Sequence, residues 1–372
     1  MMKQNWIYKK IGEICEIKTG KLDANAAVEN GIYPFFTCSK EPLSIDTYAY
    51  DCECILIAGN GDLNVKYYNG KFNAYQRTYI LSLKTNVEDV SVMYLYAFFL
   101  LYVEELRKKS IGGIIKYIKL EHLRDALIPL PPLHLQQSIV AELDNINNLI
   151  NIKKSQLKDL DNLAQSIFYE MFGDLNVQKN TLIELCNSKN DIKCGPFGTQ
   201  LSKTEYTKKG VAVWGIPQIN SHFKIQPSDY VTEEKADYLK DYDVIAGDIV
   251  MSRKGNVGQC CVYPKSFPLG IIHSDVLRIR LDSNKTNSLF MMYQLHLSEN
   301  VKHQIQLVSS GAIMPGINVT KLKKIEVDVP PLPLQQKFAE KIEAIEKHKQ
   351  IVNVTIKDLE TLLASRMQFW FE

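Results

Sequence analysis

The stretch PPLHLQQ at Pro131–Gln137 recurs as PPLPLQQ at Pro330–Gln336, and this duplication decides the fold. The same offset of 199 residues pairs Lys158–Leu160 with Lys357–Leu359 without a gap. Upstream of each motif the offset holds back to Ser110 and Ser309, and farther upstream the two copies diverge and need gaps. A displaced copy indicates an internal repeat. The chain is therefore organised as a variable block, a constant block, a second variable block and a second constant block.

The constant blocks are predicted to be long helices. Each diproline prevents a preceding helix from continuing, so each helix begins just after it. Apolar residues then step by four and three, which is typical of a coiled-coil seam. The seam positions are Ile139, Leu143, Ile146, Ile150, Leu157 and Leu160 in the first block and Phe338, Ile342, Ile345, Val352, Ile356 and Leu359 in the second.

Two helices of equal length and pattern favour pairing with each other. An ordinary buried amphipathic helix is the alternative reading of either stripe. A tandem duplication that closes on itself predicts an antiparallel coiled coil with pseudo-two-fold symmetry. Further apolar residues widen the stripe beyond a two-helix contact and leave room for partner helices: Leu149, Ile152, Leu163, Phe168, Ile351, Leu362 and Met367.

The variable blocks lack helical periodicity over most of their length. Short β-rich runs at 54–58, 79–83, 244–251 and 276–281 alternate with loops, and a helical segment (92–108; 289–306) follows in each block. The fold class is therefore α+β. We predict α+β domains at residues 1–129 and 176–328, with long helices at 130–175 and 329–372.

Composition narrows the class of protein. The chain has 372 residues, of which 45% are hydrophobic and 23% charged, and its net charge is +2. Such a chain can bury one or more cores. The small net charge argues against coating nucleic acid by bulk electrostatics. No apolar run is long enough for a membrane helix, and the N-terminus lacks a signal core, so we expect a cytoplasmic protein.

Metal and catalytic sites are not expected. The eight cysteines form no CxxC pair, and Cys52, Cys54, Cys260 and Cys261 lie in apolar runs where reduced cysteine acts as a small hydrophobe. The motifs DVPPL and LPPL lack the aromatic residue of an amino-methyltransferase site, and no P-loop is present. The acidic cluster at 227–235 is too compact for a separated nuclease site and is better explained as a charged loop.

The chain resembles the specificity subunits of type I restriction-modification systems. The two PPL motifs, each opening a long helix, carry this resemblance most specifically, and it covers nearly the whole chain. Supporting stretches are GPFGTQL and GVAVWGIPQI at 195–219, GDIVMSRKGNVG at 247–258 and SGAIMPGIN at 310–318. Members of this family usually carry an acidic residue before the final Gln of the PPL motif, where this chain has Gln136 and Gln335.

The resemblance implies a function and a set of partners. Each variable block would be a target recognition domain that reads one half of a bipartite, asymmetric site on double-stranded DNA. The helices would set the spacer and dock two methyltransferase subunits, and a translocating restriction subunit could join the complex. The chain itself would hold no cofactor, since S-adenosylmethionine would bind to the methyltransferase.

Side chains that donate to or accept from base edges are the candidates for DNA contact. In the first domain these are Asn60, Asn64, Lys66, Gln76 and Arg77, and in the second they are Gln218, Asn220, His222, Arg253, Lys254 and Asn256. For each one, a solvated surface role is the alternative.

Small residues before the PPL motifs suggest a phosphate contact. Gly112, Gly113 and Gly311 would allow the backbone to approach a phosphate closely, with Lys116 as the side-chain contact, and a simple turn is the alternative. At the level of the whole chain, the alternative function is a duplicated coiled-coil assembly protein that binds protein rather than DNA.

Overall fold

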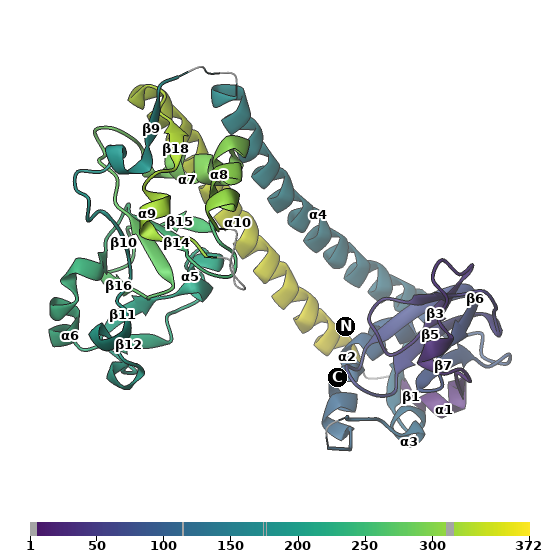
Figure 1. Ribbon diagram of the computed structural model, residues 1–372. Helices are drawn as coiled ribbons and strands as arrows, with labels where there is room; N and C mark the ends of the chain where they lie inside the picture. Colours follow the sequence, from purple (N-terminus) through teal and green to yellow (C-terminus); the bar gives the residue numbers. More distant parts are fainter. Residues whose placement is uncertain (1–5, 114, 174, 176, 310–315) are drawn as a thin grey trace. The chain divides into compact units, whose positions relative to one another are not determined.

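The computed structural model describes residues 6–113, 115–173, 175, 177–309 and 316–372 (Figure 1). The chain folds into two compact units. Unit 1 comprises Met1–Gln156 and Val352–Glu372, and unit 2 comprises Leu157–Ile351. Each unit contains one α+β region and a part of each long helix, so the predicted α+β architecture with two long helices is confirmed.

Unit 1 is built on a six-stranded sheet in the order β2-β7-β5-β6-β3-β4. The strands are β2 (Cys15–Thr19), β3 (Tyr33–Phe36), β4 (Leu43–Ile45), β5 (Tyr50–Ala58), β6 (Val65–Ala74) and β7 (Thr78–Leu83). A short ladder joins β1 (Ile7–Lys10) to β8 (Leu127–Leu130), and the shorter helices are α1 (Ile11–Ile14), α2 (Val92–Lys109) and α3 (Leu120–Arg124).

The apolar run in β5 is continuous because both faces of this strand are covered. Ile55 and Ile57 pack in the core that α2 shares with the long helices, whereas Cys54 and Leu56 pack with Phe36 on the other face. A strand buried on both sides is expected to lack the alternation of a half-exposed strand. The buried cysteine is therefore part of the packing.

Unit 2 contains two four-stranded sheets, in the orders β10-β17-β14-β15 and β12-β11-β16-β13, and a β18-β9 ladder. The strands are β9 (Lys179–Thr181), β10 (Ile192–Cys194), β11 (Val211–Trp214), β12 (Asp229–Val231), β13 (Asp243–Val244), β14 (Ile249–Ser252), β15 (Cys260–Val262), β16 (Gly270–Ile272), β17 (Val276–Ile279) and β18 (Glu326–Asp328). The shorter helices are α5 (Ile216–Asn220), α6 (Glu233–Tyr238), α7 (Ser288–Leu297), α8 (Glu299–Ser309) and α9 (Val319–Leu322).

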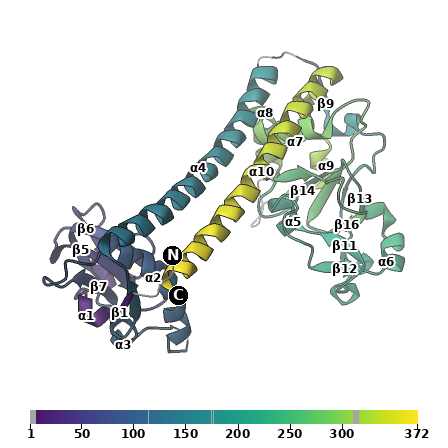
Figure 2. The same ribbon diagram turned by 180° about the vertical axis from the view of Figure 1, so that it is seen from behind.

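Two predicted elements of unit 2 are split. The predicted strand at 244–251 becomes β13 and β14, because Gly247 adopts a φ of 91° and the carboxylate of Asp248 accepts the backbone N–H of Ile245 in a turn (2.9 Å). The predicted helix at 289–306 becomes α7 and α8, because Ser298 between them is extended. Both helices lie beside α10 in the two views (Figures 1 and 2).

The two units share a scaffold. β3 runs parallel to the end of β6, and β11 runs parallel to β16 in the same way. Gly20 donates to the carbonyl of Thr78 (3.1 Å) and Gly195 to that of Val276 (3.1 Å). A Cβ on either glycine would lie within 2.5 Å of a backbone oxygen, so only glycine fits.

The long helices are α4 (Leu133–Phe172) and α10 (Leu332–Phe371), each of 40 residues. In unit 1 the carboxylate of Glu142 accepts from Arg366 (3.0 Å) and Trp370 (3.1 Å), and Lys154 pairs with Glu360 (3.0 Å). The helices therefore run antiparallel in this unit. In unit 2, Asp161 of α4 pairs with Lys349 of α10 at 2.7 Å.

The side chains at the predicted seam positions are all at least half-buried. Leu157, Leu160 and Leu359 are half-buried. The other seam positions are buried: Ile139, Leu143, Ile146, Ile150, Phe338, Ile342, Ile345, Val352 and Ile356.

Candidate nucleic-acid interface

In unit 1 a loop after β5 brings together residues that are far apart in the sequence. Gly59 donates its N–H to the carbonyl of Arg77 (2.8 Å), and Gly61, at a φ of 69°, donates to the carbonyl of Lys116 (3.0 Å). Asn60 forms a β-bridge with Tyr117. A polar recess of about 130 Å³ lies here, lined by Gly59, Gln76, Arg77, Tyr117 and neighbours. Backbone bonds thus hold three predicted contact residues at one place.

The side chains around this recess differ in how firmly they are held. Arg77 and Lys116 are exposed, and neither side chain has a hydrogen bond or ion pair within the described residues. Gln76 is also exposed and donates its amide to the carboxylate of Asp23 (3.1 Å). Asn60 is half-buried. Arg77 and Lys116 therefore offer positive charge and donors at the surface.

Asn64 and Lys66 are tied into the fold. The Asn64 amide donates to the carbonyls of Cys38 (2.8 Å) and Asp62 (2.9 Å). Its oxygen accepts a hydrogen bond from the Lys66 ammonium. Burial lowers the pKa of Lys66. These two side chains hold the loop in place.

Unit 2 repeats the same frame with different side chains. Lys254 forms a β-bridge with Gly316, Arg253 donates its N–H to the carbonyl of Asp275 (2.9 Å), and Gly255 has a φ of 70°. These backbone contacts make Asn60 equivalent to Lys254 and Arg77 equivalent to Asp275. Sequence comparison missed Asp275, although it follows β16 and precedes β17 just as Arg77 lies between β6 and β7.

Charges in the unit 2 loop are partly paired. The ammonium of Lys254 lies 2.8 Å from the carboxylate of Asp275. The Arg253 guanidinium lies over the ring of Phe197 at 4.7 Å and is half-buried. Asn256 is exposed, and its side chain has no hydrogen bond within the described residues. The loop thus presents an amide and a cation–carboxylate pair.

The remaining candidates of unit 2 lie on and after α5. Gln218 is buried, its oxygen accepts from Gly215 (3.0 Å) and its amide donates to the carbonyl of Gln226 (3.1 Å), so both ends of this side chain are used. Asn220 and His222 are exposed. His222 has a φ of 49°, which is uncommon for residues other than glycine.

The three glycines that the sequence predicted near phosphate do not share one backbone setting in the described residues. Gly112 adopts a φ of 116°, and a Cβ there would lie 2.5 Å from the carbonyl oxygen of Ile115, so this position forms a tight turn. Gly113 is exposed with open space around it. Gly311 lies outside the described residues.

The described part of the chain contains no group of three or more His, Cys, Asp or Glu side chains placed to hold a metal ion.

Burial raises the pKa of the Cys260 thiol well above its usual value. Nε2 of His296 accepts the backbone N–H of Cys260 (3.1 Å), and burial lowers the pKa of this histidine to about 4. Among the described helices, none is long and apolar enough to cross a membrane.

Comparison with known proteins places the chain in a family. Residues 3–162 and 176–361 match the type I restriction modification DNA specificity domain. The chain is 27% identical to the type I restriction enzyme EcoDI specificity subunit of Escherichia coli, over 92% of this chain and 81% of that protein. It is 22% identical to the MjaVIII specificity subunit of Methanocaldococcus jannaschii, over 92% of this chain and 86% of that protein.

Solved structures share the fold. The S subunit from M. genitalium matches with a TM-score of 0.56 at 17% identity, covering 99% of this chain and 96% of that one. A chain from a structure that describes complex assembly and conformational transition of the type I restriction-modification system matches with a TM-score of 0.61 at 17% identity, covering 98% and 96%. The family match extends over both α+β regions and most of both long helices, so the chain belongs to the DNA specificity subunits of type I restriction-modification systems.

Proposed function

We propose that each unit reads one half of a bipartite, asymmetric site on double-stranded DNA. The observation that carries this proposal is the shared loop frame with unlike side chains. Asn60 and Arg77 of unit 1 stand where unit 2 has Lys254 and Asp275. The same scaffold with different donors and acceptors recognises different base edges.

The two loops offer opposite hydrogen-bonding groups at equivalent positions. The Arg77 guanidinium carries donors only, and a guanidinium binds the O6 and N7 acceptors of guanine in two parallel hydrogen bonds. Asp275 carries acceptors only, and its pairing with Lys254 at 2.8 Å leaves lone pairs for a cytosine amino group. We assign the phosphate contact to Lys116, which is exposed beside this loop. The two half-sites should therefore differ in sequence.

The long helices offer a docking surface in each unit. In unit 1 the exposed Ile152 and Leu362 lie at matching levels of the antiparallel pair, since each is two residues from the ion pair of Lys154 with Glu360. The offset of 199 residues relates them to Ile351 and Leu163, which are exposed in unit 2. Two equivalent apolar surfaces suit two copies of one partner.

We assign these surfaces to two methyltransferase subunits, which would supply catalysis and bind S-adenosylmethionine. The chain would work in the cytoplasm as the non-catalytic reader of the complex. A restriction subunit that translocates DNA would join the same assembly. The modest net charge of +2 fits this division, because the partners would provide most of the contact with the phosphates.

The experiment is co-expression of the chain with the methyltransferase encoded beside it, followed by single-molecule sequencing of methylated bases. We expect a two-part asymmetric motif that disappears when this chain is deleted. Methylation that does not depend on the chain would favour the alternative of a coiled-coil assembly protein.

A point variant tests the unit 1 loop. R77A should reduce methylation of the full site by about 10-fold to 100-fold, which is the discrimination of one good base contact. K71A is the matched control, because Lys71 is exposed and lies opposite Asp51 in the β5–β6 ladder, at the end of the ladder away from Asn60. Equal methylation in R77A and K71A would remove Arg77 from the interface.

A further inference from the structure

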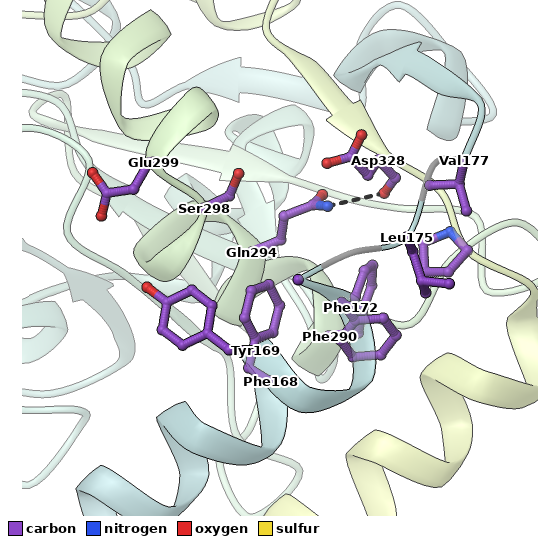
Figure 3. A pocket seen from close by; sticks show the side chains of 12 residues that line it. Phe168, Tyr169, Phe172, Leu175, Val177, Phe290, Gln294, Ser298, Glu299 and Asp328 are labelled. Carbon is purple, nitrogen blue, oxygen red and sulfur yellow. Dashed lines mark hydrogen bonds between the residues drawn. The ribbon is translucent and has the colours of Figure 1, made fainter.

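Unit 2 contains a pocket of about 240 Å³ at the end of α4, away from the proposed recognition loop. Aromatic rings form much of its wall: Phe168, Tyr169, Phe172 and Phe290. Gln294, Ser298, Glu299 and Asp328 line the rest, as Figure 3 shows. No described lining residue is a lysine, arginine or histidine.

The pocket holds a buried acceptor without a partner. The Gln294 side chain is 2% exposed, and its amide donates to the backbone carbonyl of Asp328 at 3.1 Å, which fixes its orientation. The amide oxygen has no hydrogen-bond partner within the described residues. Buried polar atoms are almost always paired, so an unpaired one in a pocket indicates a missing donor.

The internal repeat explains why the pocket exists. Ser91 and Asn287 begin equivalent helices, since their N–H groups donate to Gln136 and Gln335 respectively. Counting along both helices from these residues, Phe98 of unit 1 corresponds to Gln294. In unit 1, Phe98 stacks on Tyr102 at 5.1 Å and contacts Phe371 at 5.8 Å.

Unit 2 has acceptors where unit 1 has these rings. Tyr102 corresponds to Ser298, and the offset of 199 residues relates Pro129 to Asp328. Phe172 still packs against Phe290 at 4.7 Å, as Phe371 packs against Tyr94 at 5.1 Å. The contact between the end of the long helix and the shorter helix is therefore the same in both units. The space that Phe98 and Tyr102 fill in unit 1 is the pocket in unit 2.

The chemistry of the lining selects one kind of ligand. The Gln294 oxygen and the Asp328 carboxylate are acceptors, and Asp328 has no ion pair within the described residues. Glu299 is paired with Lys302 at 2.7 Å, and the Tyr169 hydroxyl donates to the Leu297 carbonyl at 3.0 Å. Aromatic faces attract cations, and a flat cation stacks on them.

We propose that this pocket binds a guanidinium group, as carried by an arginine. A guanidinium is planar and carries only donors, so it would pair with the Asp328 carboxylate while it stacks on the aromatic wall. A turn of the Gln294 side chain would bring its covered oxygen within reach of the same group. The arginine could come from a partner polypeptide or from a free small compound, and both sources present the same group. This inference concerns the pocket alone and does not rest on DNA reading.

The first test uses the full-length chain and N-acetyl-arginine methylamide, with binding followed by ligand-observed NMR. The citrulline counterpart has the same shape without the charge and should bind about tenfold more weakly. D328N should weaken binding of the arginine compound by about tenfold. Equal binding of the arginine and citrulline compounds would overturn the proposal.

Two further variants distinguish a loss of binding from a loss of folding. E326Q removes an exposed carboxylate from the same strand outside the pocket and should leave binding unchanged. The triple variant F290Y/Q294F/S298Y installs the unit 1 residues, so it should fold and lose binding. Unchanged binding in the triple variant would also refute the pocket as the site.

A second arm identifies the source of the arginine. In the assembled complex with methyltransferase, an arginine of the partner would exclude the probe, and D328N would weaken assembly. Binding of the probe to the assembled complex would instead assign the pocket to a free guanidino compound. Neither probe binding nor assembly uses DNA. A negative result for the pocket would therefore not bear on the proposal that the two units read a split DNA site.

Discussion

Gln136 and Gln335 occupy the same place in the two units, and both are fully buried. The Gln136 oxygen accepts the N–H of Ser91 (2.9 Å), and its amide donates to the carbonyls of Asp89 (2.8 Å) and Pro131 (2.9 Å). Gln335 likewise accepts from Asn287 and donates to Pro330. An amide suits this position because it must donate and accept at once.

An acidic residue at this position should therefore destabilise this chain. In Q136E, a carboxylate would face two carbonyl oxygens, so we expect a loss of about 1–3 kcal/mol at neutral pH. The loss should shrink at low pH, because a protonated carboxyl can donate again. Urea unfolding at several pH values measures this. Q137E, one residue along and exposed, is the control, and equal effects of the two changes would contradict the argument.

His296 predicts a pH dependence of unit 2. Burial lowers its pKa to about 4 in the folded protein, whereas an unfolded histidine titrates near 6.5. The unfolded chain therefore binds the extra proton first, and stability should fall by up to about 3 kcal/mol as the pH drops from about 6.5 to 4. H296Q should flatten this dependence in thermal unfolding, since its amide oxygen can still accept from Cys260.

At the scale of the elements, the sequence predicted the long helices better than the strands. Their seams repeat over many turns, and the diprolines mark where they begin. The split of β13 from β14 depends on a single turn at Gly247, and the break after α7 depends on Ser298, so neither changes the apolar pattern enough to be predicted.

The candidate site was predicted in part for a similar reason. Residue type alone does not distinguish Arg77, which is exposed, from Gln218, whose amide is used within the fold. The backbone bridges that join Asn60 to Tyr117 and Lys254 to Gly316 cross long stretches of sequence, and they reveal which residues share a loop. Only after this alignment does Asp275 become a candidate.

The antiparallel helices predict how the DNA spacer is set. Because α4 and α10 each contribute to both units, four residues inserted after Gln156 must be matched by four after Thr355 to keep the pairs Lys154–Glu360 and Asp161–Lys349. The matched insertion adds about 6 Å, so the tolerated spacer should lengthen by one or two base pairs. Mapping of methylated sites measures the spacer. An unchanged spacer in a folded variant would mean that the helices do not set it.

At the scale of the whole molecule, the two-unit organisation implies that the half-sites are separable. Unit 1 is closed by the last turns of α10, where Trp370 stacks on Trp6 at 6.0 Å and Phe371 packs against Tyr94 and Phe98. A recognition domain taken from a relative must supply aromatic side chains at these two α2 positions. With that contact kept, exchange of the domain should leave unit 2 intact.

Replacing residues 1–129 with the corresponding domain of a relative should therefore change one half of the methylated site and preserve the other. The physical reason is that unit 2 has its own core and its own loop at Arg253–Gly255, with side chains unlike those of unit 1. Single-molecule sequencing of methylated bases reads both halves in one experiment. Exchange of residues 176–328 is the reciprocal control and should alter the opposite half. If either exchange altered both halves, the units would not read DNA independently, and the shared frame would have to act as one composite surface.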